Sequence, residues 1–164
     1  MAKAFVRGTL LIPAMLIFLA PVTPAESLSP EETLRRYLTA VQQNQFDKAY
    51  DVVSKAMKTD RRTGQIKPKE VYVKESQYIM AFSEAKIFDF KIHPAKVEGD
   101  KAMVPNILSS QDKFLNQLGV EEYELYTLLK EDGAWKVDQQ QEVIEKKEIA
   151  EWFKKTPAEK PAKP

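Results

Sequence analysis

The sequence predicts an α+β fold in which N-terminal helices pack on an antiparallel sheet. Up to about residue 80, apolar side chains recur with the spacing of an amphipathic helix. From Phe88 onward the spacing changes to the two-residue alternation of strands. The pair Asp132-Gly133, a strong hairpin signal, separates two of these alternating stretches. Helices followed by antiparallel strands are typical of an α+β fold, and the length of the chain suits one domain.

Residues 1–25 have the three parts of a cleaved signal peptide. Lys3 and Arg7 form a basic start, residues 10–20 form an apolar run, and the small Ala25 suits the cut site. The alternative is a retained membrane anchor, but the run is about half of the ~20 apolar residues that a spanning helix needs. We therefore expect an exported protein, periplasmic or secreted, with no membrane span after cleavage. The absence of cysteine excludes a lipid-anchored lipoprotein.

Composition argues against several kinds of site. Without cysteine, the chain has no disulfide, no thiol nucleophile and no sulfur-rich zinc site. A single histidine, His93, argues against histidine metal clusters and histidine-containing triads. No glycine-rich phosphate loop is present. Basic and acidic residues nearly balance, so nucleic acid is not an expected partner, and we predict no metal and no cofactor.

Three helices are expected in the first half of the mature chain. Ser29 is placed to cap the first helix, Pro30 suits its first position, and Glu32 completes a capping box. Its apolar stripe consists of Leu34, Tyr37, Leu38 and Val41. A second, shorter helix has on one face Phe46, Ala49, Tyr50, Val53 and Met57. After a polar loop at residues 58–68, a third helix is predicted at residues 69–80.

The second half is expected to form strands. Residues 88–92 alternate with one buried face, and residues 98–100 form a turn. Residues 102–108 form a second strand, weakened by Pro105, and residues 109–119 are a connection. The last two strands, around residues 123–130 and 135–138, form a hairpin whose predicted inward side carries Tyr123, Leu125, Thr127 and Leu129.

Beyond the hairpin the pattern becomes less regular. The domain is expected to span residues 26–143, and residues 144–155 are helical or irregular. Ile149, Trp152 and Phe153 recur there at helical spacing, so this segment is expected to pack on the domain or on a partner. A membrane-surface helix is the alternative. Residues 156–164 contain mainly Pro, Ala, Lys and Glu, which predicts a disordered tail.

Two segments resemble a known superfamily. The sequence SPEETLRRYL at residues 29–38, followed by FDKAYDVVS at residues 46–54, is similar to the start of a nuclear-transport-factor-two-like domain. The sequence YTLLKEDGAWKV at residues 126–137 is similar to its final hairpin. This superfamily is also called cystatin-like or SnoaL-like. More narrowly, the chain resembles its small exported branch of unknown function, described as lumazine-binding-like, and the resemblance covers about residues 28–143.

The resemblance implies a curved antiparallel sheet that the helices close into a cone, often with a pocket inside. Members include isomerases, dehydratases, polyketide cyclases, lipid carriers and protein-binding modules, so the fold alone does not give the function. The isomerases use an acidic base, with tyrosine and a protonated acid forming an oxyanion hole. We cannot match that set residue by residue. Asp51 and Asp89 are the nearest candidates, but both alternate with apolar neighbours as solvent-facing residues do, and no acid is expected in an apolar context.

Six aromatic residues are the candidate pocket lining, because all fall on the predicted inward faces: Tyr37, Tyr50, Phe88, Phe90, Tyr123 and Trp135. Plain core packing is the alternative role for these rings. In a cone, the same rings would line a cavity for an apolar or aromatic ligand, with tyrosine hydroxyls as polar contacts. His93 is expected at the surface or at an edge of the sheet, opposite Phe88, Phe90 and Ile92.

These observations leave three hypotheses for the function. The first is an exported, non-enzymatic binding domain that takes a small apolar ligand or a protein partner. The second is a small enzyme, such as an isomerase or cyclase, with a site that the sequence does not reveal. The third is an interaction module that dimerises through its curved sheet. An enzyme needs an acid or histidine inside the cone, so the orientation of Asp51, Asp89 and His93 separates the hypotheses.

Overall fold

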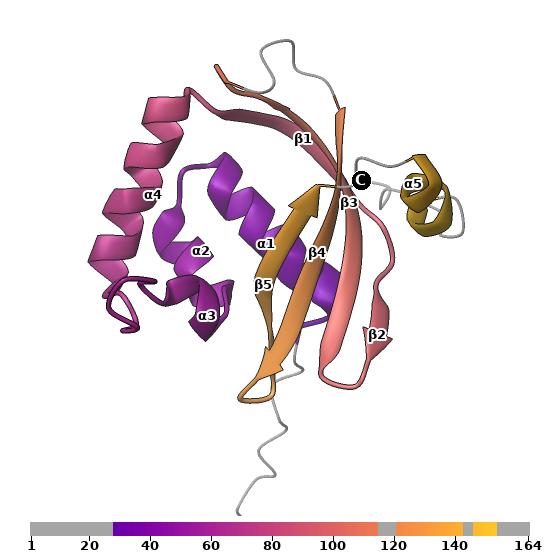
Figure 1. Ribbon diagram of the computed structural model, residues 1–164, viewed down its shortest axis with the longest axis horizontal. Helices are drawn as coiled ribbons and strands as arrows, with labels where there is room; N and C mark the ends of the chain where they lie inside the picture. Colours follow the sequence, from indigo (N-terminus) through magenta and orange to yellow (C-terminus); the bar gives the residue numbers. More distant parts are fainter. Residues whose placement is uncertain (1–27, 115–120, 143–145, 154–164) are drawn as a thin grey trace, which may run out of the picture.

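The computed structural model describes residues 28–114, 121–142 and 146–153. The predicted signal peptide at residues 1–25 and the predicted tail at residues 156–164 lie outside this part of the chain. Within it, four helices precede five strands, and a last helix follows them (Figure 1). No helix among these residues is both long and apolar enough to cross a membrane.

The strands form one open, antiparallel sheet with helices on both sides. The helices are α1 (Pro30–Gln42), α2 (Phe46–Val52), α3 (Lys55–Lys58), α4 (Lys69–Ser83) and α5 (Lys146–Phe153). The strands are β1 (Lys86–Ile92), β2 (Lys96–Glu98), β3 (Lys101–Gln111), β4 (Glu121–Glu131) and β5 (Ala134–Glu142). Their order is β1-β3-β4-β5, and β2 pairs with the first part of β3. The predicted α+β class and the single domain are confirmed.

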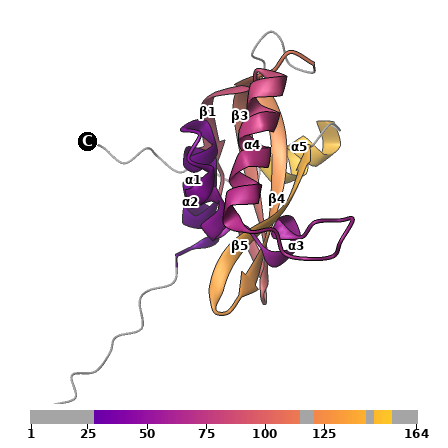
Figure 2. The same cartoon turned by 90° about the vertical axis from the view of Figure 1, so that its left-hand side faces the viewer.

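Helix α1 lies across what we call the inner face of the sheet, and α5 lies on the opposite, outer face (Figure 1). Figure 2 shows α4 beside α1 and α2, and α4 packs on α2. The predicted start of α1 is confirmed, because the Oγ of Ser29 accepts a hydrogen bond from the backbone N–H of Glu32 at 3.1 Å. Pro30 occupies the first turn, where its missing N–H costs no helical bond.

The second predicted helix divides at Val53. Helix α2 ends at Val52, and Val53 then forms a parallel bridge with Val137 of β5. Ser54 caps the short α3, with its Oγ accepting from the N–H of Met57 at 3.1 Å and donating to Asp138 at 2.7 Å. A single helix through Met57 was therefore wrong, because a backbone bond to the sheet replaces helical bonds at this point.

The third predicted helix is confirmed, and it extends three residues beyond residue 80 to Ser83. Glu84, the residue after the helix, stops it with a left-handed backbone, with φ of 54°. Strand β3 continues to Gln111, so the first residues of the predicted connection at 109–119 belong to a strand. Asp132 and Gly133 form the predicted hairpin turn between β4 and β5, both with positive φ.

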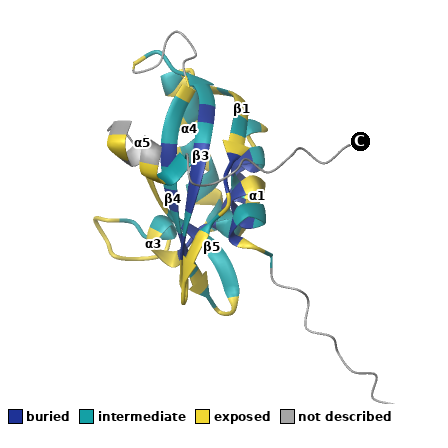
Figure 3. Ribbon diagram, turned by 90° about the vertical axis from the view of Figure 1, so that its right-hand side faces the viewer, coloured by how far each residue is buried: buried dark blue, intermediate teal, exposed yellow. Residues whose placement is uncertain are grey.

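The core lies between α1 and the inner face, where buried residues concentrate on α1 and along β3 and β4 (Figure 3). Its fully buried members include Leu34 and Leu38 from α1 and Val104, Leu128 and Val137 from the sheet. Burial of each such side chain contributes about 1.5–3 kcal/mol to folding. This packing fixes which side of each strand faces inward, and therefore which polar side chains are carried into the interior.

The predicted inward side of β4 was wrong. Glu124, Tyr126 and Leu128 are the residues that face α1, whereas Tyr123 alternates with them and lies on the outer face. Strand β4 carries apolar residues on both faces because α5 covers part of the outer face. The ring of Phe153 in α5 lies 5.2 Å from the ring of Tyr123, so the expectation that the C-terminal segment packs on the domain is met at this contact.

Candidate functional site

A buried carboxyl group is the most unusual feature of the inner face. Glu124, in the middle of β4, is fully buried. Its neighbours on the same face, Tyr126 and Leu128, belong to the apolar core, so a carboxyl group at this position is unusual. Burial removes a carboxyl group from water and disfavours its charged form, unless hydrogen bonds and opposite charges replace the lost hydration. Burial raises the pKa of Glu124 from 4.5 to about 7. Glu124 therefore changes its charge near neutral pH, which an ordinary glutamate does not do.

Three side chains from three neighbouring strands hold the Glu124 carboxyl group. Asn106 of β3 lies directly across from Glu124, and its Nδ2 donates to Oε2 at 2.7 Å. Gln140 of β5 donates from Nε2 to Oε1. The hydroxyl of Tyr126, two residues further along β4, is the third partner. Because these strands are paired in register, the sheet itself places the three groups around one carboxyl.

Desolvation and hydrogen bonding act on Glu124 in opposite directions. The bonds from Asn106, Tyr126 and Gln140 favour the charged form and lower its pKa. Burial is the larger effect, and the nearby charge of Glu122 adds to it, so the net shift is upward. The carboxylate of Glu122 is itself held by a hydrogen bond from the Oγ of Ser110 at 2.6 Å.

Two buried tyrosines lie beside this carboxyl group. The rings of Tyr37 in α1 and Tyr126 in β4 are 6.4 Å apart in an edge-to-face arrangement. Burial raises the pKa of both hydroxyls well above the ordinary value, and the charge of Glu124 raises both further. Both hydroxyls therefore stay protonated at any physiological pH and remain hydrogen-bond donors.

The interior also holds acceptors that lack a donor. The Oδ1 of Asn106 is buried and has no hydrogen-bond partner among the described residues, and the same is true of the Oγ1 of Thr33. A buried acceptor without a hydrogen bond reduces the stability of the folded protein by about 1–3 kcal/mol, unless a ligand or water supplies a donor. Gln140 is exposed as a residue, so the cluster of Glu124, Asn106, Tyr126 and Gln140 extends from the core to the surface.

This cluster gathers an ionisable group and several hydrogen-bonding groups in surroundings of low dielectric constant. When Glu124 is protonated, its O–H becomes a donor toward an oxygen atom. When Glu124 is charged, it accepts from its three partners. Asn106 offers a free acceptor beside it. Among the described residues, no group of three or more acidic or histidine side chains is arranged to hold a metal ion.

The six predicted pocket residues do not come together at this cluster. Tyr37 lies beside Tyr126, whereas Phe90 and Trp135 are half-buried and pack against the core. Tyr123 lies on the outer face. A pocket-lining role for these residues stays a prediction.

The two remaining rings lie elsewhere. Tyr50 of α2 contacts Tyr72 of α4, with ring centroids 5.3 Å apart, and its hydroxyl donates to the carbonyl of Lys67 at 2.9 Å. Phe88 is 52% exposed, because β1 is irregular between Ile87 and Asp89 and its alternation shifts there. For these two rings also, the pocket role stays a prediction.

The two candidate acids face solvent. Asp51 is exposed and forms an ion pair with Lys69 at 2.8 Å, and Asp89 is exposed with its Oδ1 accepting from the N–H of Phe90 at 2.8 Å. His93 is 5% exposed, so the expected surface position was wrong, but its alternative place at an edge of the sheet agrees with the structure, because His93 follows the edge strand β1. Its ring lies under α5, 5.2 Å from the ring of Phe153. The acid in an apolar context is Glu124, which contradicts the expectation that the chain has none.

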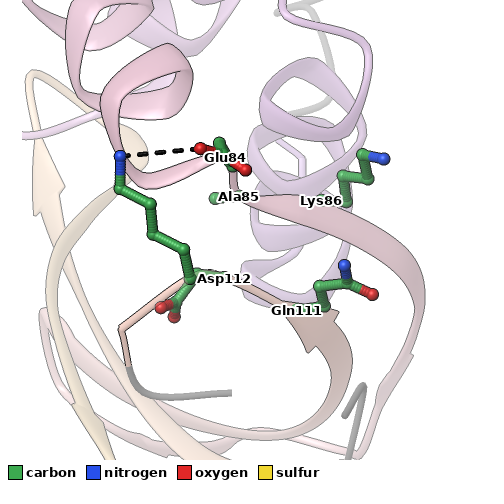
Figure 4. A pocket seen from close by; sticks show the side chains of 6 residues that line it. Glu84, Ala85, Lys86, Gln111 and Asp112 are labelled. Carbon is green, nitrogen blue, oxygen red and sulfur yellow. Dashed lines mark ion pairs between the residues drawn. The ribbon is translucent and has the colours of Figure 1, made fainter. Parts of the chain in front are cut away.

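Two surface pockets lie away from the Glu124 cluster. One is at the turn between α4 and β1, next to the end of β3, and is lined by polar side chains; its Lys113 and Glu84 form an ion pair at 3.6 Å (Figure 4). The other lies along α1 and α2 and is lined by charged residues such as Arg36, Lys48 and Asp51. Both pockets mix charges of either sign, so neither selects a ligand by charge alone.

No protein-family model matches the sequence. No curated protein matches it significantly. Among solved structures, a proposed ketosteroid isomerase from Shewanella frigidimarina has a TM-score of 0.50 at 16% identity, covering 70% of this chain and 94% of that protein. A protein of unknown function with a cystatin-like fold from Nostoc punctiforme has a TM-score of 0.49 at 11% identity, covering 70% and 87%. A proposed polyketide cyclase from Sinorhizobium meliloti has a TM-score of 0.43 at 14% identity, covering 67% and 94%.

At these identities the likeness concerns the fold and leaves the chemistry open. In this chain the fold consists of N-terminal helices laid on one face of an open antiparallel sheet. The expectation drawn from residues 29–54 and 126–137 is met at this level. The chain has the nuclear-transport-factor-two-like, or cystatin-like, fold.

Proposed function

We propose that the protein is an exported binding domain whose inner face takes a small, mainly apolar molecule with one polar group. The observation that carries this proposal is the fully buried Glu124, whose pKa of about 7 leaves it partly protonated at neutral pH. Protonated Glu124 is the donor that recognises the polar group, and Tyr126 holds its carboxyl group in place. Tyr126 belongs to the apolar core, so the rest of the molecule would meet apolar side chains at this place.

A structural role alone gives this cluster little advantage. A well-packed apolar residue at position 124 would avoid the desolvation cost that raises the pKa of the carboxyl. The cluster also leaves the Oδ1 of Asn106 without a donor. Strained or unsatisfied buried polar groups concentrate at functional sites. A ligand that supplies the missing donor would relieve this cost.

The donor and the free acceptor limit what the polar group of the ligand is. Protonated Glu124 calls for an acceptor oxygen, and the Oδ1 of Asn106 calls for a donor beside it. A hydroxyl group or a protonated acid has both. We therefore propose an apolar or aromatic alcohol, or a weak acid in its neutral form, as the ligand class.

The proposal places this activity outside the cytoplasm. It rests on the basic start, apolar run and small cut-site residue within residues 1–25. Fractionation of cells that express the full-length chain tests this part separately. Recovery of a shortened chain from the periplasm or the medium supports export, and an uncleaved chain in the cytoplasm contradicts it.

Native mass spectrometry of the protein from its producing cells tests the binding function. We expect extra mass on the wild-type protein that disappears on denaturation. The Glu124→Leu variant should lose this mass, because it has no donor at the site. The matched control is Glu121→Gln, an exposed residue three positions away on the same strand, which should retain it. Equal retention by Glu124→Leu and the control, with both variants folded by circular dichroism, contradicts a ligand site at Glu124.

A second candidate function is an isomerase or cyclase in which Glu124 acts as a general acid or base. The pKa of about 7 favours it, because catalysis by proton transfer is most effective when the pKa is near the working pH. The structural likeness to a proposed ketosteroid isomerase adds to this candidate. Incubation with cyclic unsaturated ketones in deuterated water separates the two functions. Deuterium incorporation that depends on Glu124 supports the enzyme, and unchanged ketones support the binding domain.

A further inference from the structure

Helix α4 carries an exposed apolar face that no described residue buries. It consists of Val71, Tyr78, Ile79 and Phe82 on α4, together with Phe114 just after β3, and we call it the α4 face. These side chains are between 41% and 68% exposed. Along α4 they follow the three- and four-residue spacing of a single helical stripe. An isolated exposed ring needs no explanation, but a stripe of this kind does.

The α4 face is one continuous surface. The rings of Tyr78 and Phe82 are stacked with centroids 5.9 Å apart, and the ring of Phe114 lies 5.6 Å from that of Phe82. The Nζ of Lys113 lies 4.4 Å from the centre of the Phe82 ring and 5.1 Å from that of Phe114. A shallow hollow beside this surface is lined by Tyr78 and Ile79 together with Lys74 and Glu75.

The rest of the domain contacts a different side of α4. Tyr72 faces α2, where its ring lies 5.3 Å from that of Tyr50. In the described part of the chain, no residue of α4 is buried. Figure 2 shows α4 at the front of the helical layer, with the sheet behind it. Tyr78 and Phe82 lie away from this contact, whereas Ile79, seven residues after Tyr72, lies at the border between the two sides and is 62% exposed.

The size of the α4 face suits a second copy of the chain. Aromatic side chains present about 150–250 Å² each, so the exposed parts of the five residues amount to on the order of 500 Å² of apolar surface. This is at the upper end of the patches that monomers leave uncovered, roughly 300–600 Å². Two such faces with their polar margins would bury roughly 1,200 Å² in total, which is the lower bound of specific interfaces.

We propose that the α4 face is a homodimer interface in which two copies pack α4 against α4 about a twofold axis. A twofold contact needs a surface that complements itself. The α4 face offers such a surface, because the exposed rings of Tyr78, Phe82 and Phe114 adjoin a shallow hollow lined in part by Tyr78 and Ile79. At the margin, Lys74 supplies a positive charge, and Glu75, which pairs with Lys67, supplies a negative one. The proposal does not involve Glu124 and is independent of the ligand site.

Sedimentation velocity on the protein expressed from its full-length sequence tests the interface. From about 1 to 200 µM, a range that brackets weak and moderate association, we expect a reversible shift from monomer to dimer. Phe82→Glu should keep the protein monomeric, because it places a charge in the centre of the apolar contact. The matched control is Val97→Glu on β2, where the original residue is 51% exposed compared with 55% for Phe82. The control should dimerise like the wild type.

The absence of cysteine from the chain permits a second, direct measurement. Ile79→Cys should form a covalent dimer under mild oxidation or with a short bis-maleimide, and Val97→Cys should not. A wild-type protein that stays monomeric throughout the concentration range overturns the proposal. So does a dimer that survives Phe82→Glu, or one in which both cysteine variants cross-link equally.

Discussion

Replacing Glu124 by glutamine should remove a pH dependence of stability that one buried carboxyl imposes on the whole domain. The pKa of Glu124 is about 7 in the folded protein and close to 4.5 when the chain is unfolded. Between these values the folded protein binds a proton that the unfolded chain has released. Stability from this group is therefore complete below about pH 4.5 and is lost as the pH rises through 7.

The magnitude follows from the size of the shift. One pKa unit corresponds to about 1.4 kcal/mol, so the shift from 4.5 to about 7 is equivalent to about 3 kcal/mol of unfolding free energy. For a domain of this length, that is a large part of a total of roughly 5–15 kcal/mol. Glu124→Gln has no titrating group, so it should retain at high pH what the wild type loses.

Glutamine should also fit the site. The two carboxyl oxygens of Glu124 accept hydrogen bonds from the amide groups of Asn106 and Gln140. A glutamine at position 124 has an NH₂ group in place of one of these oxygens, so two donors would face each other there. Rotation of the Asn106 amide resolves this conflict, because its Oδ1 has no partner now and would then accept from the new amide. We therefore expect stabilities within about 1 kcal/mol of each other at low pH.

Urea unfolding followed by tryptophan fluorescence measures the effect, since Trp135 packs against the core and reports its loss. From about pH 5 to pH 8.5, the stability of Glu124→Gln relative to the wild type should increase by roughly 2–3 kcal/mol. Other titrating groups are common to both proteins and cancel in this difference. Parallel pH profiles, with a gap that stays constant, would refute the assignment of a raised pKa to Glu124.

Three further substitutions test the surroundings of this site and the core. Tyr126→Phe removes a hydroxyl that lowers the pKa of Glu124, so carbon-13 NMR of the Glu124 carboxyl should give a midpoint higher than that of the wild type. Ser54→Ala removes the cap of α3 and the bond to Asp138, and it should cost about 1–2 kcal/mol in urea unfolding. Leu128→Ala should cost about 2–5 kcal/mol in the same assay, because Leu128 is fully buried, and a loss below 1 kcal/mol would contradict its place in the core.

Local signals in the sequence were enough for most of the helical layer. The cap at Ser29 and the proline at position 30 act within a few residues, so they depend little on the rest of the fold. The hairpin turn at Asp132 is equally local. The division after Val52 was missed because its cause is not local. Val53 bridges to Val137, which lies more than eighty residues along the chain.

The inward side of β4 could not be determined from its own residues. The stretch from Tyr123 to Leu129 has an apolar residue on each of its two alternating faces, namely Tyr123 and Leu125 on one and Tyr126 and Leu128 on the other. Such a strand is covered on both sides, and only the neighbouring elements decide which side faces α1. Here Tyr126 contacts Tyr37 of α1, while Tyr123 contacts Phe153 of α5.

The same ambiguity hid the candidate site. With Tyr123 and Leu125 taken as inward, Glu124 falls on the solvent side, where a glutamate needs no explanation. With the strand in its actual orientation, Glu124 enters the core between Asn106 and Gln140, and its pKa rises because water is excluded. The sequence of such a strand predicts a buried acid only when another element, such as a helix, is known to cover the apolar residues on the opposite face. The packing of Tyr126 and Leu128 in the core buries the side of β4 that carries Glu124, and the contact of Phe153 with Tyr123 covers the opposite side.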